Sequence, residues 1–130
     1  MKSADISLIR FATESVDDDS GHRTGILVAA HELRDEGELS AVEHAVVRLE
    51  LEWFNCNLPI PGKLESEEHR RAISWFKPSA AEFISRMWRL KTILEIHGIS
   101  VRVLKTTEPG CIVHEDSFQV IAKPKKGRRY

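Results

Sequence analysis

Residues 111–116 bring together a compact set of reactive side chains. The sequence CIVHED holds a thiol, an imidazole and two adjacent carboxylates. A thiol beside an imidazole is the arrangement of an activated nucleophile, and carboxylates near an imidazole are typical of acid–base catalysis. The question is therefore whether this stretch is an active site or the tip of an ordinary hairpin.

The flanking residues predict a β-hairpin. Residues 110–114 and 117–122 are rich in β-branched residues, and Asp116 is a common turn former. The expected register pairs Val113 with Phe118 across the two strands.

Strand alternation then separates the thiol from the imidazole. Cys111 and His114 are three residues apart, so without a bulge they point to opposite faces and cannot form a nucleophilic pair. We expect Cys111 to lie in the core beside Val120, and Glu115 and Asp116 to form a polar hairpin tip. A functional carboxylate at that tip is the alternative.

Other catalytic and metal-binding motifs are missing from the sequence. None of the six histidines lies in an H-E-x-x-H motif or at zinc spacing from a cysteine. The three aspartates at 17–19 lack the spacing of a calcium loop, and no Walker loop, dinucleotide fingerprint or G-x-S-x-G motif occurs. We therefore assign no catalytic residue, no metal and no cofactor, and we expect Cys56 to be a core residue.

Two aromatic dipeptides are a more distinctive feature, in WFNCN (53–57) and WFK (75–77). Consecutive residues diverge by about 100° in a helix and 180° in a strand, so one aromatic of each pair can enter the core while the other lines a surface. An exposed tryptophan near asparagine and lysine is typical of a recognition patch. Burial of both tryptophans in a small core is the alternative. The predicted binding residues are Trp53, Asn55, Asn57, Trp75, Lys77, His114, Glu115 and Asp116.

The first half of the chain must position these residues with one strand and two helices. Residues 6–13 predict a strand, whereas 24–36 fit either a strand or a helix ending at Gly37, which we favour. Ser40 and Glu43 form a capping box for a second helix that must end before the prolines at 59 and 61. That helix carries two apolar stripes, so we expect it to lie between other elements.

The second half predicts a βαβ unit. Residues 73–76 form a short strand and 99–105 alternate as another, with a helix over 79–97 between them. Ser79 and Glu82 form a second capping box, and Gly98 ends the helix.

Together these elements predict an α+β fold: a mixed, largely antiparallel sheet of four or five strands with about three helices packed mainly on one face. Residues 1–122 form a single domain, and 123–130 form a basic C-terminal tail.

Composition is typical of a globular protein, and we expect a cytoplasmic one. Hydrophobic residues make up 42% and charged residues 30% of the chain, which excludes a disordered class. No apolar run is long enough for a membrane span, and the N-terminus does not resemble a signal peptide. Two cysteines without a secretion signal indicate free thiols in a reducing compartment.

The net charge of −1 hides an asymmetry. Residues 1–68 hold 15 acids and 6 bases, or −9, and residues 69–130 hold 5 acids and 13 bases, or +8. A basic tail is typical of phosphate or acidic partners, although a solubilising terminus is the alternative. The residues of this nucleic-acid hypothesis are Arg86, Arg89, Lys123, Lys125, Lys126, Arg128 and Arg129.

Three stretches resemble a family of small uncharacterised bacterial proteins: WFNCNLPIP (53–61), WFKPSAAEFISRM (75–87) and PGCIVHEDSFQVIAKP (109–124). His114 departs from the family pattern, which carries an aromatic there. The resemblance implies a coherent single domain and no particular activity. Its pattern includes Trp53, Asn55, Asn57, Trp75, Glu115 and Asp116.

Three functional hypotheses follow. The first is a small protein-interaction or regulatory protein that binds a protein partner or itself and performs no catalysis. The second is a nucleic-acid-associated protein that uses the tail. The third is a small enzyme with a site at residues 114–116. None of the three involves a membrane.

Overall fold

The computed structural model describes residues 6–16, 22–58 and 71–125. The aspartates at 17–19, most of the charged connector at 63–71 and the last five tail residues lie outside these ranges. The elements, in chain order, are β1 (Leu8–Val16), β2 (Arg23–Gly25), α1 (Ile26–Asp35), α2 (Ala41–Asn57), β3 (Ile73–Phe76), α3 (Ala81–Ile96), β4 (Val101–Thr106), β5 (Cys111–Glu115) and β6 (Gln119–Lys123).

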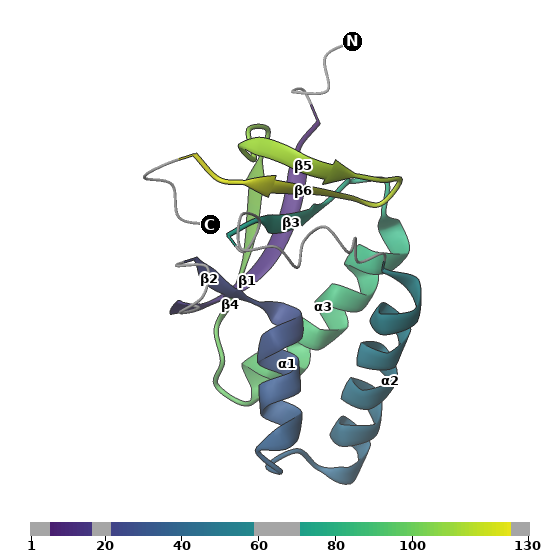
Figure 1. Cartoon of the computed structure of the whole chain (residues 1–130). Helices are drawn as coiled ribbons and strands as arrows, with labels where there is room; N and C mark the ends of the chain where they lie inside the picture. Colours follow the sequence, from purple (N-terminus) through teal and green to yellow (C-terminus); the bar gives the residue numbers. More distant parts are fainter. Residues whose placement is uncertain (1–5, 17–21, 59–70, 126–130) are drawn as a thin grey trace.

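All six described strands belong to one antiparallel-paired sheet (Figure 1). β4 pairs with β1 along one edge, and the opposite edge of β1 is shared by β3 near Ile9 and by β2 from Ala12 onward. β6 pairs with β3, and β5 pairs with β6. Because β3 and β4 are both antiparallel to β1, they run parallel to each other, with α3 connecting them. The predicted βαβ unit is therefore present, with β1 between its two strands.

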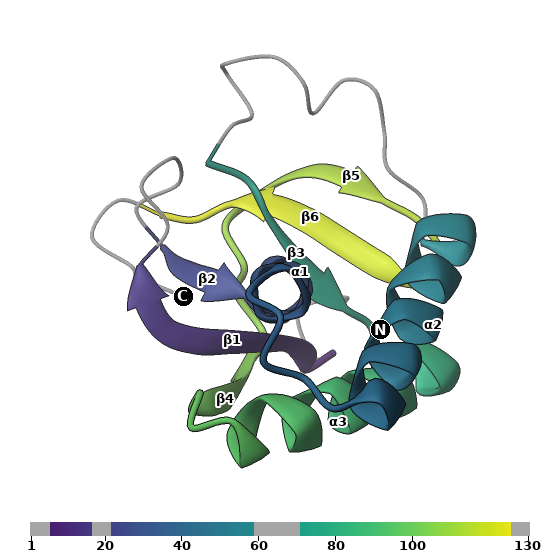
Figure 2. The same cartoon turned by 90° about the horizontal axis from the view of Figure 1, so that it is seen from below.

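The three helices cover one face of the sheet, as the α+β prediction requires (Figures 1 and 2). The main core lies between these layers and includes Phe11 and Phe76 from the sheet and Leu33, Phe54 and Leu90 from the helices. The sheet has one strand more than the upper predicted number, because Arg23–Gly25 pairs with β1 before α1 begins.

A second, smaller core lies on the other face of the sheet. Leu8, Ile73, Trp75 and Val120 are buried there with Leu104 packed against them. Alternation along β3 explains the division, because its apolar residues point in turn to one face and the other. The helix-free face is therefore not simply a solvated surface.

Residues 24–36, which fit two structures in sequence, are mainly helical. The buried residues of α1 are Ile26, Ala29, Ala30 and Leu33, which lie on one helical face. The favoured helix is therefore confirmed, although its N-terminal residues belong to β2.

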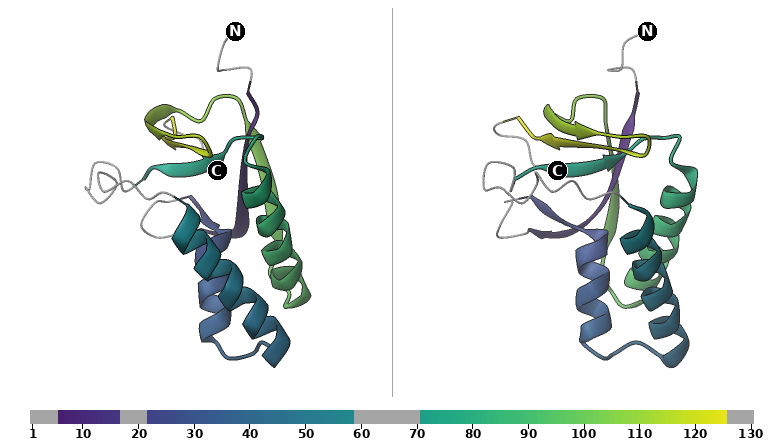
Figure 3. Two further views of the ribbon diagram at one scale, coloured as in Figure 1. Left: turned by 90° about the vertical axis from the view of Figure 1, so that its right-hand side faces the viewer. Right: turned by 45° about the vertical axis from the view of Figure 1, so that its right-hand side comes forward.

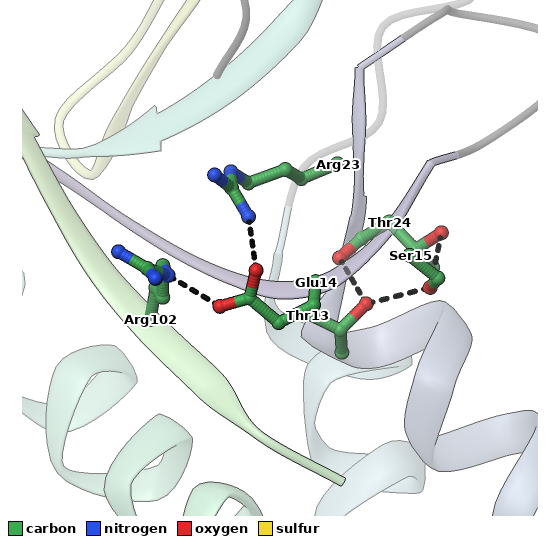
Figure 4. Close-up of polar contacts among 6 residues, drawn as sticks. All are labelled: Thr13, Glu14, Ser15, Arg23, Thr24 and Arg102. Atoms are coloured by element: carbon green, nitrogen blue, oxygen red, sulfur yellow. Dashed lines mark hydrogen bonds and ion pairs between the residues drawn. The ribbon is translucent and has the colours of Figure 1, made fainter.

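Ion pairs tie β2 and β4 to opposite sides of β1. The carboxylate of Glu14 accepts a hydrogen bond from Arg102 on β4 and another from Arg23 on β2, the latter at 3.0 Å (Figure 4). These hydrogen bonds, that of Arg102 first, lower the pKa of Glu14. Thr13, Ser15 and Thr24 add hydroxyl contacts between β1 and β2. This polar group therefore adds side-chain contacts to the backbone pairing of β2, β1 and β4.

The first predicted capping box is confirmed. The hydroxyl of Ser40 accepts from the backbone N–H of Glu43 at 3.1 Å, and the Glu43 carboxylate accepts from the backbone N–H of Ser40 at 3.0 Å. The same carboxylate lies 3.0 Å from the ring of His97 at the end of α3. Glu43 therefore both caps α2 and joins it to α3.

The second predicted capping box is wrong. The backbone N–H of Ala80 donates to the Lys77 carbonyl at 2.9 Å, which closes a turn, and Ala80 itself is the N-cap of α3. Ser79 lies within that turn and makes no cap bond. The predicted C-terminus is correct: Gly98 has a φ of 82°, and Ile99 N–H closes the last turn on Leu94.

No helix in the described ranges combines the length and apolar character needed to cross a membrane.

Candidate functional site

The hairpin containing the HED sequence has a different register from the one expected. Glu115 pairs with Val120, and Cys111 pairs with Lys123. The predicted pairing of Val113 with Phe118 is therefore wrong. The turn lies after Glu115 instead of at Glu115 and Asp116.

The side chain of Asp116 explains this turn. One of its oxygens accepts from the backbone N–H groups of Phe118 and Gln119 at 2.8 and 3.0 Å. The other lies 2.9 Å from the ring of His114 and accepts from the Gln119 amide at 3.1 Å, and Gln119 in turn accepts from Ser74 at 2.6 Å. Burial raises the pKa of Asp116, but these hydrogen bonds outweigh it and leave the pKa below its usual value. His114 and Asp116 are thus engaged in shaping the turn.

A β-bulge at residue 113 changes which side chains of β5 share a face. Ile112 pairs with Ala122, and His114 pairs with Ile121. Two residues that are two positions apart on β5 are therefore paired with two consecutive residues of β6. Side chains of neighbouring residues in β6 point to opposite faces. Ile112 and Glu115 therefore lie on the same face, although they are three residues apart.

The bulge also places Cys111 and His114 on the same face, so the expectation that they diverge is wrong. Cys111 is exposed and its thiol has no hydrogen-bond partner in the described ranges, while the ring of His114 contacts Asp116. Cys56 is exposed as well. Both predictions of core cysteines are therefore wrong, and no thiol–imidazole contact exists among the described residues.

A concave pocket of about 270 Å³ lies on the helix-free face, next to the hairpin. Leu8 and Val120 of the second core line it, together with Ile112. The ammonium of Lys77 lies at its edge, 2.7 Å from the carboxylate of Glu115. Of His114, Glu115 and Asp116, the predicted binding residues of the hairpin, only Glu115 lines this pocket.

An aromatic row connects the end of α2 to the hairpin tip. The ring of Trp53 lies 4.9 Å from that of Phe83, which lies 4.7 Å from that of Phe118. The guanidinium of Arg86 covers Trp53, 4.1 Å from the ring centroid. Three segments far apart in sequence therefore meet at this end of the molecule.

The remaining predicted binding residues do not form one patch. Trp75 is fully buried, so it offers no surface to a partner, and both aromatics of its dipeptide face cores. The side chain of Asn57 donates to the Trp53 carbonyl at 2.8 Å, and the exposed side chain of Asn55 makes no hydrogen bond in the described part of the chain. Trp88 is the tryptophan with the most exposure, at 48%.

The helical arginines of the nucleic-acid hypothesis face an acidic partner. Arg86 contacts the buried carboxylate of Glu50 at 2.8 Å, and Arg89 lies 3.6 Å from it. Lys123 is half-buried and Lys125 is exposed. Lys126, Arg128 and Arg129 lie outside the described residues. Among the described residues of this hypothesis, few cationic side chains are therefore available to bind phosphate groups.

One apolar stripe of α2 is exposed, contrary to the prediction from the sequence. The two apolar stripes of α2 are both real, but only the one containing Val47, Leu51 and Phe54 is buried. The other points away from the core, with Val42 exposed by 75% and Leu49 by 56%. The prediction that α2 lies between elements on both sides is therefore wrong.

The exposed stripe continues onto α3, which runs beside α2 (Figure 3). The contacts of Glu43 with His97 and of Glu50 with Arg86 set the two helices antiparallel. By helical periodicity the exposed stripe of α2 then lies beside the outward side of α3, where Ile96 is 68% exposed. We call this surface the outer helical face; its apolar residues are Val42, Val46, Leu49, Trp53, Ile93 and Ile96.

Within the described ranges, no group of three or more His, Cys, Asp or Glu side chains is arranged to hold a metal ion. The chain matches no protein-family model, no curated protein and no solved structure. The resemblance noted in the sequence thus stays a prediction, and function must be argued from these surfaces.

Proposed function

We propose that this chain is a small cytoplasmic interaction protein that acts by binding, and that its partner at the outer helical face is a second copy of itself. The observation that carries the proposal is the exposure of Val42, Leu49 and Ile96, each more than half exposed on adjoining helices. Contiguous apolar surface of this kind is costly to leave in water and marks interaction sites.

Charge favours a second copy as the occupant. With the buried Glu50 left out, α2 holds Glu43 and Glu52 against Arg48, a net charge of −1. α3 holds two acids and three bases, so −2 + 3 = +1. A two-fold axis parallel to the helices places α2 of one copy on α3 of the other, where the opposite charges attract.

The geometry also suits self-association. Two adjacent antiparallel helices form a layer, and two such layers can pack face to face as a four-helix bundle. Exposed Arg89 and Glu52 border the apolar residues, which is the usual division into apolar core and polar rim. The half-buried ring of Trp53 would add an aromatic anchor at one end.

Sedimentation velocity over a range of concentrations tests the proposal. We expect the full chain to dimerise, and Val42→Lys or Leu49→Lys to shift it to a monomer with unchanged circular dichroism. Val28→Lys is the matched control, because Val28 is 53% exposed on α1 and lies outside the outer helical face. A wild-type chain that stays monomeric to about 0.5 mM, or a dimer that Val28→Lys disrupts equally, would refute the proposal.

A further inference from the structure

The pocket on the helix-free face combines an apolar floor with one ion pair. Leu8, Ile112 and Val120 supply the floor, and Lys77 and Glu115 lie at its edge. At about 270 Å³ the pocket falls just below the range of about 300–1,000 Å³ that accommodates drug-sized ligands. It therefore suits a smaller molecule.

Close packing of the β4–β5 connection on β6 shapes one wall of this pocket. Gly110 has a φ of 114°, and a Cβ at this position would lie 2.1 Å from the carbonyl oxygen of Lys123. The connection between β4 and β5 thus packs directly on the end of β6, and Pro109 beside it is buried. On the opposite side the bulge in β5 turns Glu115 toward the pocket together with Ile112. A site preformed in this way needs little reordering to bind a ligand.

The ion pair leaves both of its members with hydrogen-bonding capacity. An ammonium has three donors, and Glu115 is the one partner of the Lys77 ammonium in the described ranges. Among the described residues, only one oxygen of Glu115 has a partner, and its side chain is 47% exposed. The site can therefore accept a carboxylate at Lys77 and an ammonium at Glu115 at the same time.

The total charge around the pocket fits a ligand that is neutral overall. Its charged lining residues in the described part of the chain are Lys77, Lys125, Glu108 and Glu115, which sum to zero. A simple carboxylate would be repelled by Glu115, and a hydrocarbon would leave the pair without new partners. We propose that this pocket binds a small zwitterion with an apolar side chain, the chemistry of a free apolar amino acid. This proposal is independent of the outer helical face.

Isothermal titration calorimetry of the full chain with L-leucine, L-valine and L-phenylalanine tests the proposal. For the best of these we expect saturable binding, with amide NMR shifts at Gly110 and Ile112. Blocking one charge, as in the N-acetyl derivative or the amide of that amino acid, should weaken binding about tenfold or more. Lys77→Met and Glu115→Gln should do the same.

Lys91→Met is the matched control variant. Lys91 lies 2.7 Å from Glu95, and its side chain is 19% exposed, as is that of Lys77. It lies on α3, away from the pocket lining, so its substitution should leave affinity unchanged. Thermal unfolding of each variant checks that it is folded. If Lys77→Met is unstable, Glu115→Gln still tests the ion pair, because the side chain of Glu115 is partly exposed and its substitution should preserve the fold.

Three results would overturn the proposal. The first is no saturable binding of any of the three amino acids up to about 20 mM. The second is equal binding of the N-acetyl derivative and the free amino acid. The third is binding that Glu115→Gln leaves unchanged or that Lys91→Met weakens equally.

Discussion

The contact of Glu50 with Arg86 allows a stringent test of how α2 and α3 are held together. The carboxylate of Glu50 is 6% exposed and accepts from Arg86 at 2.8 Å. Its second oxygen is buried without a hydrogen-bond partner in the described ranges. Replacing Arg86 by methionine keeps a long side chain but removes the guanidinium from Trp53, and it leaves the buried carboxylate of Glu50 without its main partner.

The expected cost follows from this burial. Removing one member of a buried ion pair costs about 3–5 kcal/mol. Arg89 remains 3.6 Å from Glu50, and Arg86 is itself one fifth exposed, so we place Arg86→Met at the lower end, about 3 kcal/mol. At about 4 °C per kcal/mol, Tm should fall by about 12 °C. Urea unfolding followed by circular dichroism measures the free energy directly.

Two further variants test whether the loss of stability comes from the buried carboxylate of Glu50. Arg48→Met removes an exposed pair with Glu52 on the same helix and should change stability by no more than about 0.5 kcal/mol. Adding Glu50→Leu to Arg86→Met removes the stranded charge and should restore most of the lost stability. A cost of Arg86→Met below about 1 kcal/mol, or a double variant no more stable than Arg86→Met alone, would show that the buried carboxylate does not depend on Arg86.

Two further predictions concern backbone geometry and pH. Gly110→Ala should cost roughly 3 kcal/mol, because the new Cβ would meet the Lys123 carbonyl at a positive φ. Gly37→Ala, with a φ of 74° and no atom within 4 Å, should cost only about 1 kcal/mol in the same urea assay, and equal costs would contradict this account. Hydrogen bonds from the backbone of Ser40 and then from the ring of His97 lower the pKa of Glu43 below 4.5. Because the unfolded chain then binds the proton more readily, stability should fall as pH drops below about 4.5, and this fall should be smaller in Glu43→Gln. An identical pH dependence in both proteins would contradict the role of Glu43.

The sequence alone determined the elements whose signals are local. Ser40 and Glu43 specify the start of α2 because both bonds of a capping box form within one turn. Gly98 ends α3 because a residue without Cβ adopts a positive φ there without strain. Residues 73–76 form β3 with the predicted bounds, and the α+β class follows from the order of such segments.

The tertiary structure decided which faces are buried and how the strands pair. Pairing of β6 with β3 places Val120 opposite Trp75, and the side chain of Asp116 closes the turn, so the hairpin register differs from the expected one. The bulge that brings Ile112 and Glu115 into one pocket has no local sequence signal.

The choice between the two apolar stripes of α2 likewise depended on where α1, α3 and the sheet pack. Each stripe satisfies the same helical periodicity, so the sequence could not tell which one faces the core. Only the packed structure shows Val47 buried and Val42 exposed, because burial is set by the neighbours that the rest of the chain supplies.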